Sequence, residues 1–523
     1  MAVHGIRGPS GTKYILIESE GVAACIPLNN FVEERAAKRE LVDQGIPIIG
    51  QNRWRKLLDK VSDVIDFPYA PVIEKVGWNA SHFALPDGSV FPCDEGARAP
   101  TSIDIVRGKC DKLGTLKQWR NQVSKPLKKQ PFATFLLMTA FMPPILELSS
   151  RYGNIGFEIV GGKGTGKSTL QYLVASAYGD IRQSTRGHYW TTLDTTFNGL
   201  EAAMKSHADL LIIMDEANLL AADAAPKVRS DLFKALAFKL GSGSIKDRYN
   251  QSAETDYRLG FIISSNEPLA QLLGQGSESA RAAADRLLTL PVGADKKHGI
   301  FDVLPHRYSS GSAFAQALLA AAEKNHGHAM PRYLSCLVEA KKQDEGSLRK
   351  DIQAYLEDFR KHAGVNLNDG SAVRVADAFG LVYAAGALAK KYGVLHKRLK
   401  PGAAALHCYR LHIEQMVDPQ IAFIDRLRLV AEDDRILTIS ATMPIEAEAI
   451  GYIHNYKGTE ELLVQPKMIE TVFPDWQAIK DSAEVRRTLK VDGKHMQAKR
   501  KIGQHKRSRM YCFKLCRGKL LES

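Results

Sequence analysis

The sequence predicts an α/β protein of several domains, with an open sheet at the centre of its main domain. Residues 161–168 read GGKGTGKS and lie between an apolar run at 154–160 and a run of good helix formers at 168–178. Downstream, the apolar run 209–214 ends in two adjacent carboxylates, and the apolar run 259–265 ends in a polar pair. Short apolar runs that end in polar residues are typical of buried strands in an open α/β sheet.

The glycine-rich segment has the pattern GxxxxGK[ST] in the context of strand, loop and helix. Its glycines allow successive backbone N–H groups to curl around a phosphate, and the N-terminus of the following helix adds partial positive charge. In this pattern Lys167 reaches the β- and γ-phosphates and Ser168 ligates Mg²⁺. A glycine-rich turn without a ligand is the alternative. We predict that ATP and Mg²⁺ bind at Gly161, Gly162, Lys163, Gly164, Thr165, Gly166, Lys167, Ser168 and Thr169.

The carboxylates Asp215 and Glu216 support this prediction. Paired acids at the carboxyl end of a strand point into the crevice where open α/β sheets bind ligands. Asp215 is predicted to hold Mg²⁺, and Glu216 is predicted to polarise the attacking water. The alternative is a buried strand that ends at an acidic turn; the upstream phosphate-loop pattern favours the catalytic interpretation.

Two further positions match those of AAA+ ATPases. Asn266 follows the apolar run 259–265, which is the sensor position, where a polar side chain orients water against the γ-phosphate. Arg286 precedes the apolar run 287–292, where AAA+ proteins place the arginine finger that acts on a neighbouring subunit's nucleotide. Arg281 is the reserve candidate for the finger, and a surface arginine on a helix is the alternative.

Composition limits the class of protein. The 523 residues predict three or four domains, and the 45% hydrophobic and 25% charged fractions are typical of a soluble globular protein. The net charge of +13 favours a polyanionic partner. Seven scattered cysteines without a CxxC pair favour neither a disulfide framework nor a zinc site. Because the N-terminus lacks the apolar run of a signal peptide, we expect a cytoplasmic protein.

The predicted domains follow from shifts in pattern along the chain. Residues 1–110 are rich in strand and turn patterns, with a helical stretch at 34–62, and residues 111–300 hold the nucleotide-binding core with its preceding helices. A helical lid and linker at 301–420 and a basic domain at 421–523 follow. The most apolar stretch, 131–148, is interpreted as a buried helix beside the core, because Pro143-Pro144 and Glu147 argue against a membrane span.

Two basic segments are candidate DNA contacts. Residues 241–249 are glycine-rich and are predicted to form a hairpin that carries Lys246 and Arg248; a solvated surface turn is the alternative. Between 466 and 515, two short helices followed by two strands predict a winged helix, in which one helix enters a DNA groove and basic wing residues touch phosphates. A solvated basic tail is the alternative. The candidate wing residues are Lys499, Arg500, Lys501, Arg507 and Arg509.

These motifs, with several others, resemble those of the ATPase family known as domain of unknown function nine-two-seven. The similar segments lie between about residues 60 and 345. They are Val76-Gly77-Trp78 with the LPDG turn, Gly114-Thr115-Leu116 with Trp119, the phosphate loop, Trp190 with Asn198-Gly199-Leu200-Glu201, the Asp215-Glu216 strand and the segment 241–248. That last segment departs from the family pattern, since Ser-Gly-Ser-Ile-Lys-Asp-Arg replaces Asn-Gly-x-Gly-Lys-x-Arg, which leaves the DNA-contacting residues open.

The resemblance implies a fold and a function. Members are carried by phages, plasmids and genomic islands, and some, such as the helicases of staphylococcal cassette chromosomes, are similar to AAA+ helicases of the minichromosome-maintenance type. The implied fold class is α/β: an AAA+ P-loop NTPase core, a β-rich N-terminal domain, and a helical plus winged-helix C-terminal region. The implied function is that of an ATP-dependent replicative DNA helicase.

The resemblance also implies partners. It implies a homo-oligomeric ring, taken as a hexamer. From the two basic segments we expect single-stranded DNA in the channel of the ring and duplex DNA at the C-terminal domain. No membrane partner is expected, and the setting is the cytoplasm of a bacterial or phage-infected cell. One alternative is an AAA+ ATPase that remodels protein or acts as a nucleotide switch in defence or transcription. A second is a nucleic-acid-binding module whose ATPase acts only as a clamp.

Overall fold

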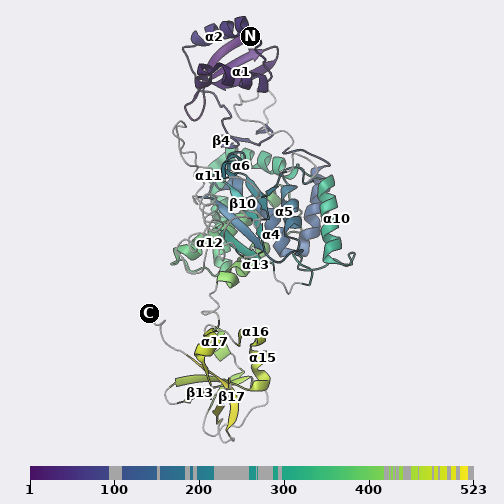
Figure 1. Cartoon of the computed structure of the whole chain (residues 1–523), viewed down its shortest axis with the longest axis vertical. Coiled ribbons are helices and arrows are strands. Elements are labelled where there is room, and N and C mark those ends of the chain that lie inside the picture. Colours follow the sequence, from purple (N-terminus) through teal and green to yellow (C-terminus); the bar gives the residue numbers. More distant parts are fainter. Residues whose placement is uncertain are drawn as a thin grey trace. The chain divides into compact units, whose positions relative to one another are not determined.

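A computed structural model gives the fold of the chain (Figure 1). The chain divides into two compact units, Met1–His412 and Ile413–Ser523. The predicted start of the C-terminal domain at 421 lies close to this division, and the predicted boundaries at 110 and 300 lie within the first unit. The structure describes residues 1–92, 109–149, 153–182, 189–192, 197–216, 258–266, 268, 287–292, 297–416, 423, 426–427, 430–431, 435–439, 449–456, 459–473, 476–480, 483–491, 496–501 and 507–515.

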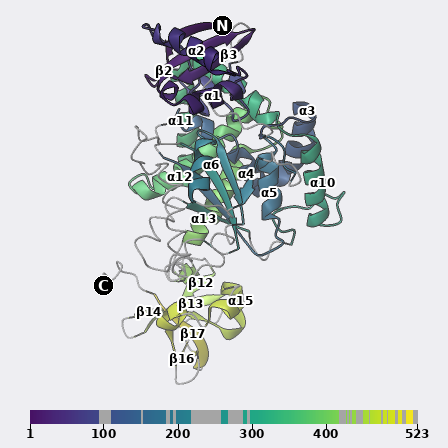
Figure 2. The same cartoon turned by 45° about the horizontal axis from the view of Figure 1, so that its top comes forward.

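The first unit begins with a three-stranded antiparallel sheet and two helices (Figure 2). The elements are β1 (Ala2–Arg7), β2 (Lys13–Ser19), β3 (Val22–Pro27), η1 (Leu28–Val32), α1 (Glu34–Asp43) and α2 (Gln51–Ser62). Side chains alternate along a strand, so Ile15 and Ile17 of β2 share one face, and they belong to the same buried cluster as Leu41 of α1 and Trp54 of α2. The observed order of strands and helices agrees with the sequence pattern.

The central sheet of the first unit is parallel. Its strands are β7 (Ile155–Val160), β8 (Thr191–Thr192), β9 (Leu211–Asp215), β10 (Gly260–Ser265) and β11 (Leu287–Pro291), in the spatial order β11-β7-β10-β9-β8. Every neighbouring pair is parallel. Strands β7, β9 and β10 are buried at every residue, which explains their continuous apolar sequences. The carboxyl ends of all these strands therefore lie at one edge of the sheet, where β7 leads into the phosphate loop.

Helices that precede the sheet strands in the sequence and helices that follow them pack around the sheet (Figure 1). Phe135 of α4 and Phe379 of α12 stack at 5.4 Å, and their rings lie 5.1 and 5.4 Å from Phe157 of β7. The stretch 131–148 is buried as the sequence predicts. The helices are α3 (Leu116–Trp119), η2 (Arg120–Ser124), η3 (Lys125–Lys129), α4 (Pro131–Thr139), η4 (Pro143–Ile145), α5 (Lys167–Ala175), α6 (Phe197–Lys205), α10 (Gly311–Lys324), α11 (Ala329–Ala363), α12 (Gly370–Lys391) and α13 (Pro401–Met416).

Helix α12 is the one helix of the described residues that is long and apolar enough to cross a membrane by length and composition. Of its most apolar window, 67% is buried inside the unit. Its Phe379 packs on the central sheet, which is the packing expected of a core helix.

A small three-stranded sheet docks beside the amino end of β9. It consists of β4 (Gly77–Asn79), β5 (His82–Ala84) and β6 (Val90–Phe91), and the expected Asp87-Gly88 turn joins β5 to β6. The Trp78 backbone N–H donates to Oδ2 of Asp209 at 3.0 Å, and its indole N–H donates to the Pro144 carbonyl at 2.8 Å. A Cβ at Gly77, where φ is +89°, would lie 2.6 Å from the Ala208 carbonyl oxygen, so this close approach requires glycine. The Val76-Gly77-Trp78 motif thus fixes the hairpin to the sheet.

The second unit is a six-stranded sheet with short helices. Its strands are β12 (Ile436–Thr438), β13 (Gly451–Tyr456), β14 (Thr459–Val464), β15 (Leu489–Lys490), β16 (Ala498–Arg500) and β17 (Ser508–Lys514), in the order β12-β13-β14-β17-β15, and β16 also pairs with β17. The helices are η6 (Pro466–Met468), α15 (Ile469–Val472), α16 (Trp476–Ile479) and α17 (Ala483–Thr488). Helices followed by the β16–β17 hairpin match part of the predicted pattern, but β12 to β14 extend the sheet beyond a two-stranded wing.

Candidate nucleotide-binding site

The phosphate loop spans the interval between β7 and α5. Its backbone turns through Gly164 and Gly166, whose φ angles of +76° and +99° lie in the left-handed region that favours glycine. A Cβ at Gly166 would also lie 2.9 Å from the Ile300 side chain. The Ile300 N–H donates to the Thr165 carbonyl at 3.0 Å, and the Thr165 hydroxyl donates to the Gly162 carbonyl at 3.0 Å. The predicted nucleotide-binding residues 161–169 therefore form one continuous loop and helix start.

The ammonium of Lys167 lies at the centre of this loop. Its Nζ donates to the carbonyls of Gly161 at 2.5 Å and Gly162 at 3.0 Å, and to Oδ1 of Asn266 at 3.2 Å. Burial lowers the pKa of Lys167, and the nearby charges of Asp215 and Glu216 act in the opposite direction. Two predicted site residues that are 99 positions apart, Lys167 and Asn266, are thus brought into contact.

The carboxylate of Asp215 is the most heavily hydrogen-bonded group of the site. Its Oδ1 accepts from the hydroxyls of Ser264 at 2.6 Å and Ser168 at 3.2 Å, and its Oδ2 accepts from the Tyr172 hydroxyl at 3.3 Å. Carboxylate and hydroxyl oxygens are the protein ligands that Mg²⁺ prefers, so the donor set of Asp215 and Ser168 fits this ion. Within the described residues, no group of three or more His, Cys, Asp or Glu side chains forms another candidate metal site.

Glu216 follows Asp215 in a left-handed backbone conformation, with φ of +57°. Its N–H donates to Oδ1 of Asp215 at 3.0 Å and to the Ser264 hydroxyl at 2.9 Å, and these bonds hold the turn. Its side chain is exposed at the edge of the sheet where the phosphate loop lies. A non-glycine residue in this conformation costs roughly 1–2 kcal/mol, so the surrounding bonds must hold it in place.

Two residues of the site are absent from the sequence prediction. Ser264 bridges Asp215 and the Glu216 backbone, and Tyr172 reaches Asp215 from α5 while its ring packs 4.8 Å from that of Trp190. A serine near the end of an apolar strand carries little signal by itself. Tyr172 lies four residues after Ser168, so helical spacing places both on one face of α5. This spacing is a sequence signal that indicates Tyr172 as a neighbour of the Mg²⁺-binding position.

Four predicted site residues lie outside the described residues: the finger candidates Arg281 and Arg286 and the hairpin candidates Lys246 and Arg248. The five predicted DNA contacts of the second unit are described, and they fall into two groups. Lys499, Lys501, Arg507 and Arg509 are exposed. Lys499 and Arg509 lie opposite each other in the β16–β17 ladder.

Arg500 differs from these four because it is buried. Its Nε and Nη2 donate to the two oxygens of Glu461 at 2.7 and 3.1 Å, and Lys490 binds the same carboxylate at 2.5 Å. Burial alone would raise the pKa of Glu461, but the hydrogen bonds from Arg500 and Lys490 bring it below its ordinary value. The guanidinium of Arg500 thus forms a buried ion pair with Glu461 inside the unit, whereas the sequence predicts Arg500 as a DNA contact.

Comparisons with known proteins give one match to a family model and a similar fold. Residues 26–256 match the model of the family described as "Domain of unknown function (DUF927)". The chain is similar to the solved structure titled "SCCmec type IV Cch - active helicase", with a TM-score of 0.58 and 13% identity over 98% of this chain and 92% of that chain. The A form apo structure of the NrS-1 C terminal region gives a TM-score of 0.26 at 12% identity over 62% of this chain and 65% of that chain, which is too low to indicate a shared fold. No curated protein matches the sequence.

The two findings agree with the motifs. At 13% identity, the first structural match shows a shared mixed α/β fold that extends over nearly the whole of both chains. The family match begins before the first motif in the sequence and ends after the segment 241–248, so it covers the phosphate loop and the Asp215-Glu216 strand. The family whose model matches residues 26–256 is therefore the one that the motifs predict.

Proposed function

We propose that this protein is an AAA+ ATPase that couples ATP hydrolysis to movement on DNA, as a ring-forming replicative helicase of a phage, plasmid or genomic island. The observation that carries the proposal is the meeting of Lys167, Ser168, Asp215 and Asn266 at the carboxyl edge of the parallel sheet. Such an edge is where open α/β sheets bind ligands. The strand order β11-β7-β10-β9-β8, in which the phosphate-loop strand has neighbours on both sides, supports an AAA+ core.

Each residue then has a chemical role. The loop N–H groups and Lys167 bind the phosphates of ATP, and Ser168 and Asp215 hold Mg²⁺, which neutralises charge on the β- and γ-phosphates when bound. Glu216 accepts a proton from the attacking water, and Asn266 orients that water. Arg286, with Arg281 in reserve, completes the site of a neighbouring subunit, where an arginine finger contributes about 10³–10⁵ in rate.

The similarity to a solved structure whose title names an active helicase supports DNA as the partner. So does the β16–β17 hairpin. Like charges directly opposite each other in a ladder are unfavourable, and Lys499 faces Arg509 there, so a bound phosphate would relieve their repulsion. Lys501 and Arg507 extend this exposed positive end toward duplex DNA, whereas Lys246 and Arg248 are proposed to contact a single strand in the channel. The proposed setting is the cytoplasm of a bacterial or phage-infected cell.

ATP hydrolysis is tested with Lys167→Ala and Glu216→Gln, each compared with Lys205→Ala, which removes an exposed lysine on α6. Lys167→Ala is expected to abolish turnover, and Glu216→Gln is expected to bind ATP and hardly hydrolyse it. Near-normal turnover in Lys167→Ala would contradict the assignment of the phosphate loop. Loss of ATP binding in Glu216→Gln would mean that the roles of Asp215 and Glu216 are misassigned.

Coupling to DNA is tested on the wild-type chain. Helicase function requires ATP turnover that rises with DNA and strand displacement on a forked substrate. Turnover without any DNA response would favour an ATPase that remodels protein, and DNA-stimulated turnover without displacement would favour a clamp. Mixing Arg286→Ala with Lys167→Ala subunits is expected to restore part of the activity in a ring, because one complete site forms at a mixed interface. No recovery at any ratio would argue against the shared site.

A further inference from the structure

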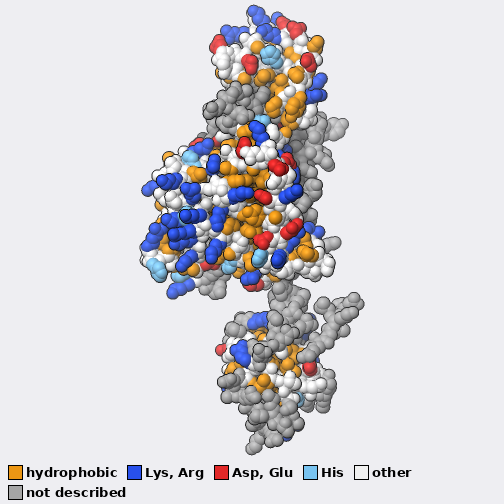
Figure 3. Space-filling model, turned by 180° about the vertical axis from the view of Figure 1, so that it is seen from behind, with side chains coloured by type: hydrophobic (Ala, Val, Ile, Leu, Met, Phe, Trp, Pro, Cys, Tyr) orange, Lys and Arg blue, Asp and Glu red, His pale blue; other side chains and the backbone are white. Residues whose placement is uncertain are grey.

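Positive charge is unevenly distributed over the first unit. On the face drawn in Figure 3, Lys and Arg side chains gather densely on one side of this unit. In this unit, two basic segments far apart in the sequence are joined directly. Arg120 Nη1 donates to the Gly393 carbonyl at 2.6 Å, and the His396 N–H donates to the Ser124 hydroxyl at 3.0 Å. We call the combined area the basic surface: Lys117, Arg120, Lys125, Lys128, Lys129, Lys390, Lys391, Lys397, Arg398 and Lys400.

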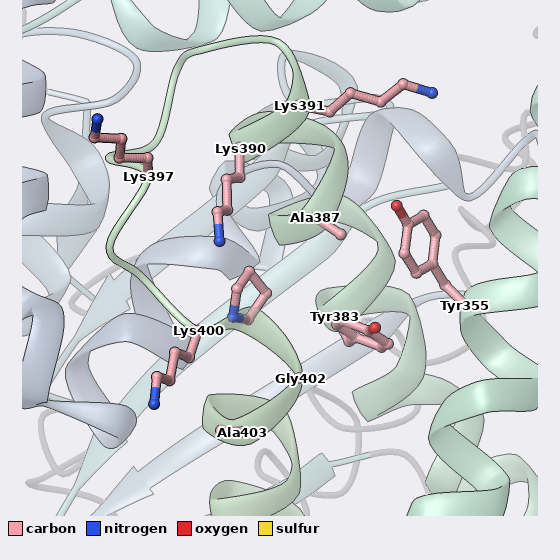
Figure 4. Close-up of a pocket in the computed structure, with 10 residues that line it drawn as sticks. Tyr355, Tyr383, Ala387, Lys390, Lys391, Lys397, Lys400, Gly402 and Ala403 are labelled. Carbon is pink, nitrogen blue, oxygen red and sulfur yellow. The ribbon is translucent and has the colours of Figure 1, made fainter.

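A cavity of about 510 Å³ opens at the edge of this surface, between α11, α12 and the segment that leads into α13 (Figure 4). Tyr355 and Tyr383 lie on one side of it, with their rings in an edge-to-face pair at 5.2 Å. The residues on the other sides that matter here are Lys390, Lys391, Lys397 and Lys400. The cavity therefore combines aromatic faces with several ammonium groups.

Few carboxylates offset this charge. Asp351 pairs with Lys391 at 3.3 Å, and Asp358 accepts a hydrogen bond from the Tyr383 hydroxyl at 3.2 Å. Lys390 donates to the Leu399 carbonyl at 3.0 Å, and this neutral acceptor does not cancel the charge of the ammonium group. Lys400 also stands at the N-terminus of the 16-residue helix α13, where a cation is unfavourable and an anion is favourable.

The pKa of His396, a residue of the second segment, reflects the same excess of positive charge. Burial lowers the pKa of His396, and Lys125, Arg398, Arg120 and Lys397 lower it further. Cations from both segments thus act on one imidazole, which agrees with the hydrogen bonds that join them.

We propose that the basic surface and its cavity bind single-stranded DNA, with phosphates along the lysines and one unstacked base against Tyr355. Proteins that bind single strands combine a positive groove for the backbone with aromatic side chains on which bases stack, and both parts are present here. A duplex would bring phosphates to the lysines, but its bases are stacked in the helix and do not reach a cavity. The residues of this contact differ from those of the nucleotide site and of the β16–β17 hairpin, and its supporting observations do not depend on ATP hydrolysis.

The charge part of the proposal is tested in the full chain with Lys397→Glu/Lys400→Glu. Binding of a fluorescent oligothymidylate is measured across a salt series, because each phosphate contact to a single strand contributes about 0.7 to the slope of log affinity against log salt. We expect the slope to fall by about 1.4 and the affinity at low salt to fall about tenfold or more. The matched control is Lys342→Glu/Lys361→Glu, which reverses two exposed lysines of α11 outside the basic surface and should keep the wild-type slope. An unchanged slope in Lys397→Glu/Lys400→Glu overturns the proposal.

The stacking part is tested with Tyr355→Leu, which keeps an apolar side chain but removes the ring. Affinity for the single strand should fall about fivefold, and affinity for a duplex of the same length should not change. Equal losses on both substrates, or no loss on the single strand, overturn the role of Tyr355. ATP turnover without DNA is measured in each variant and should match wild type. A wild-type chain that binds the oligothymidylate but does not hydrolyse ATP would contradict the proposed function and leave this inference standing.

Discussion

Replacing Ser264 with alanine tests the structural account of the nucleotide site at a residue that the motifs do not include. Its hydroxyl donates to Oδ1 of Asp215 at 2.6 Å and accepts from the Glu216 N–H at 2.9 Å. One side chain therefore orients the proposed Mg²⁺ ligand and anchors the backbone of the proposed general base. We expect Ser264→Ala to fold and bind ATP, and to hydrolyse it slowly.

The size of the loss follows from the bond that is removed. A hydrogen bond to a charged group contributes about 1.5–3 kcal/mol. Asp215 keeps its longer bonds to Ser168 and Tyr172, and the Glu216 N–H keeps Asp215 Oδ1 at 3.0 Å, so the turn is loosened rather than lost. If the loss of this bond raises the activation free energy of the chemical step by the same amount, kcat falls roughly 10- to 150-fold, since about 1.4 kcal/mol is a factor of ten.

The assay is steady-state ATP turnover together with the affinity for a fluorescent ATP analogue. Ser176→Ala is the matched control because Ser176 is a buried serine that also donates one hydrogen bond, to Leu173, and accepts one, from Trp119. Its removal should lower the unfolding temperature and spare kcat per folded molecule. A Ser264→Ala variant with the kcat and KM of wild type would refute the role that we assign to this bridge.

Three further predictions concern the rest of the molecule. Gly77→Ala should lower the free energy of unfolding of the first unit by more than about 2 kcal/mol in a denaturant titration, because alanine there would adopt a left-handed backbone and clash with Ala208. The control is Gly11→Ala, at φ of +87° with open space around it, which should lose only the free energy of placing alanine in the left-handed region. Glu461→Gln should lower the free energy of unfolding of the second unit by about 3 kcal/mol at neutral pH. Because the folded pKa of Glu461 lies below its ordinary 4.5, its stabilisation is present above that value and is lost as pH falls through the folded pKa, so the variant should lack this acid-sensitive part of the unfolding curve. Lys499→Glu/Arg509→Glu should lower the salt slope of duplex binding by about 0.9 per lost contact, and a slope equal to wild type would argue that the hairpin does not touch DNA.

The sequence was sufficient for the strands that carry the nucleotide site. The runs 154–160, 209–214, 259–265 and 287–292 correspond to β7, β9, β10 and β11, because strands buried on both faces are continuously apolar and stand out from their surroundings. Lys167, Ser168, Asp215 and Asn266 could be placed at one edge for the same reason. Strand β8, Thr191–Thr192, has only two residues and no periodicity to detect.

The sequence was less informative about the second unit. The pattern between 466 and 515 indicated helices and a hairpin, but β12, β13 and β14 precede that pattern and were not predicted. Without β14, the partner of Arg500 could not be found, since Glu461 lies 39 positions upstream on that strand. An arginine in a basic run is therefore indistinguishable from its neighbours until the sheet is assembled.

Strand β7, which pairs with β10 and β11, carries one charged side chain, and that residue bears on how the sheet assembles. Glu158 is buried, and its oxygens accept hydrogen bonds from the hydroxyls of Ser265 on β10 at 2.6 Å and Thr289 on β11 at 3.3 Å. A slip of either strand by one residue would turn its hydroxyl to the opposite face and leave a buried carboxylate short of a donor. Strands with only apolar side chains would tolerate such slips better, because similar aliphatic side chains pack alike in neighbouring registers. Glu158 thus discriminates against misaligned sheets during folding and keeps the strand ends level, so that the loop after β7 faces Asn266.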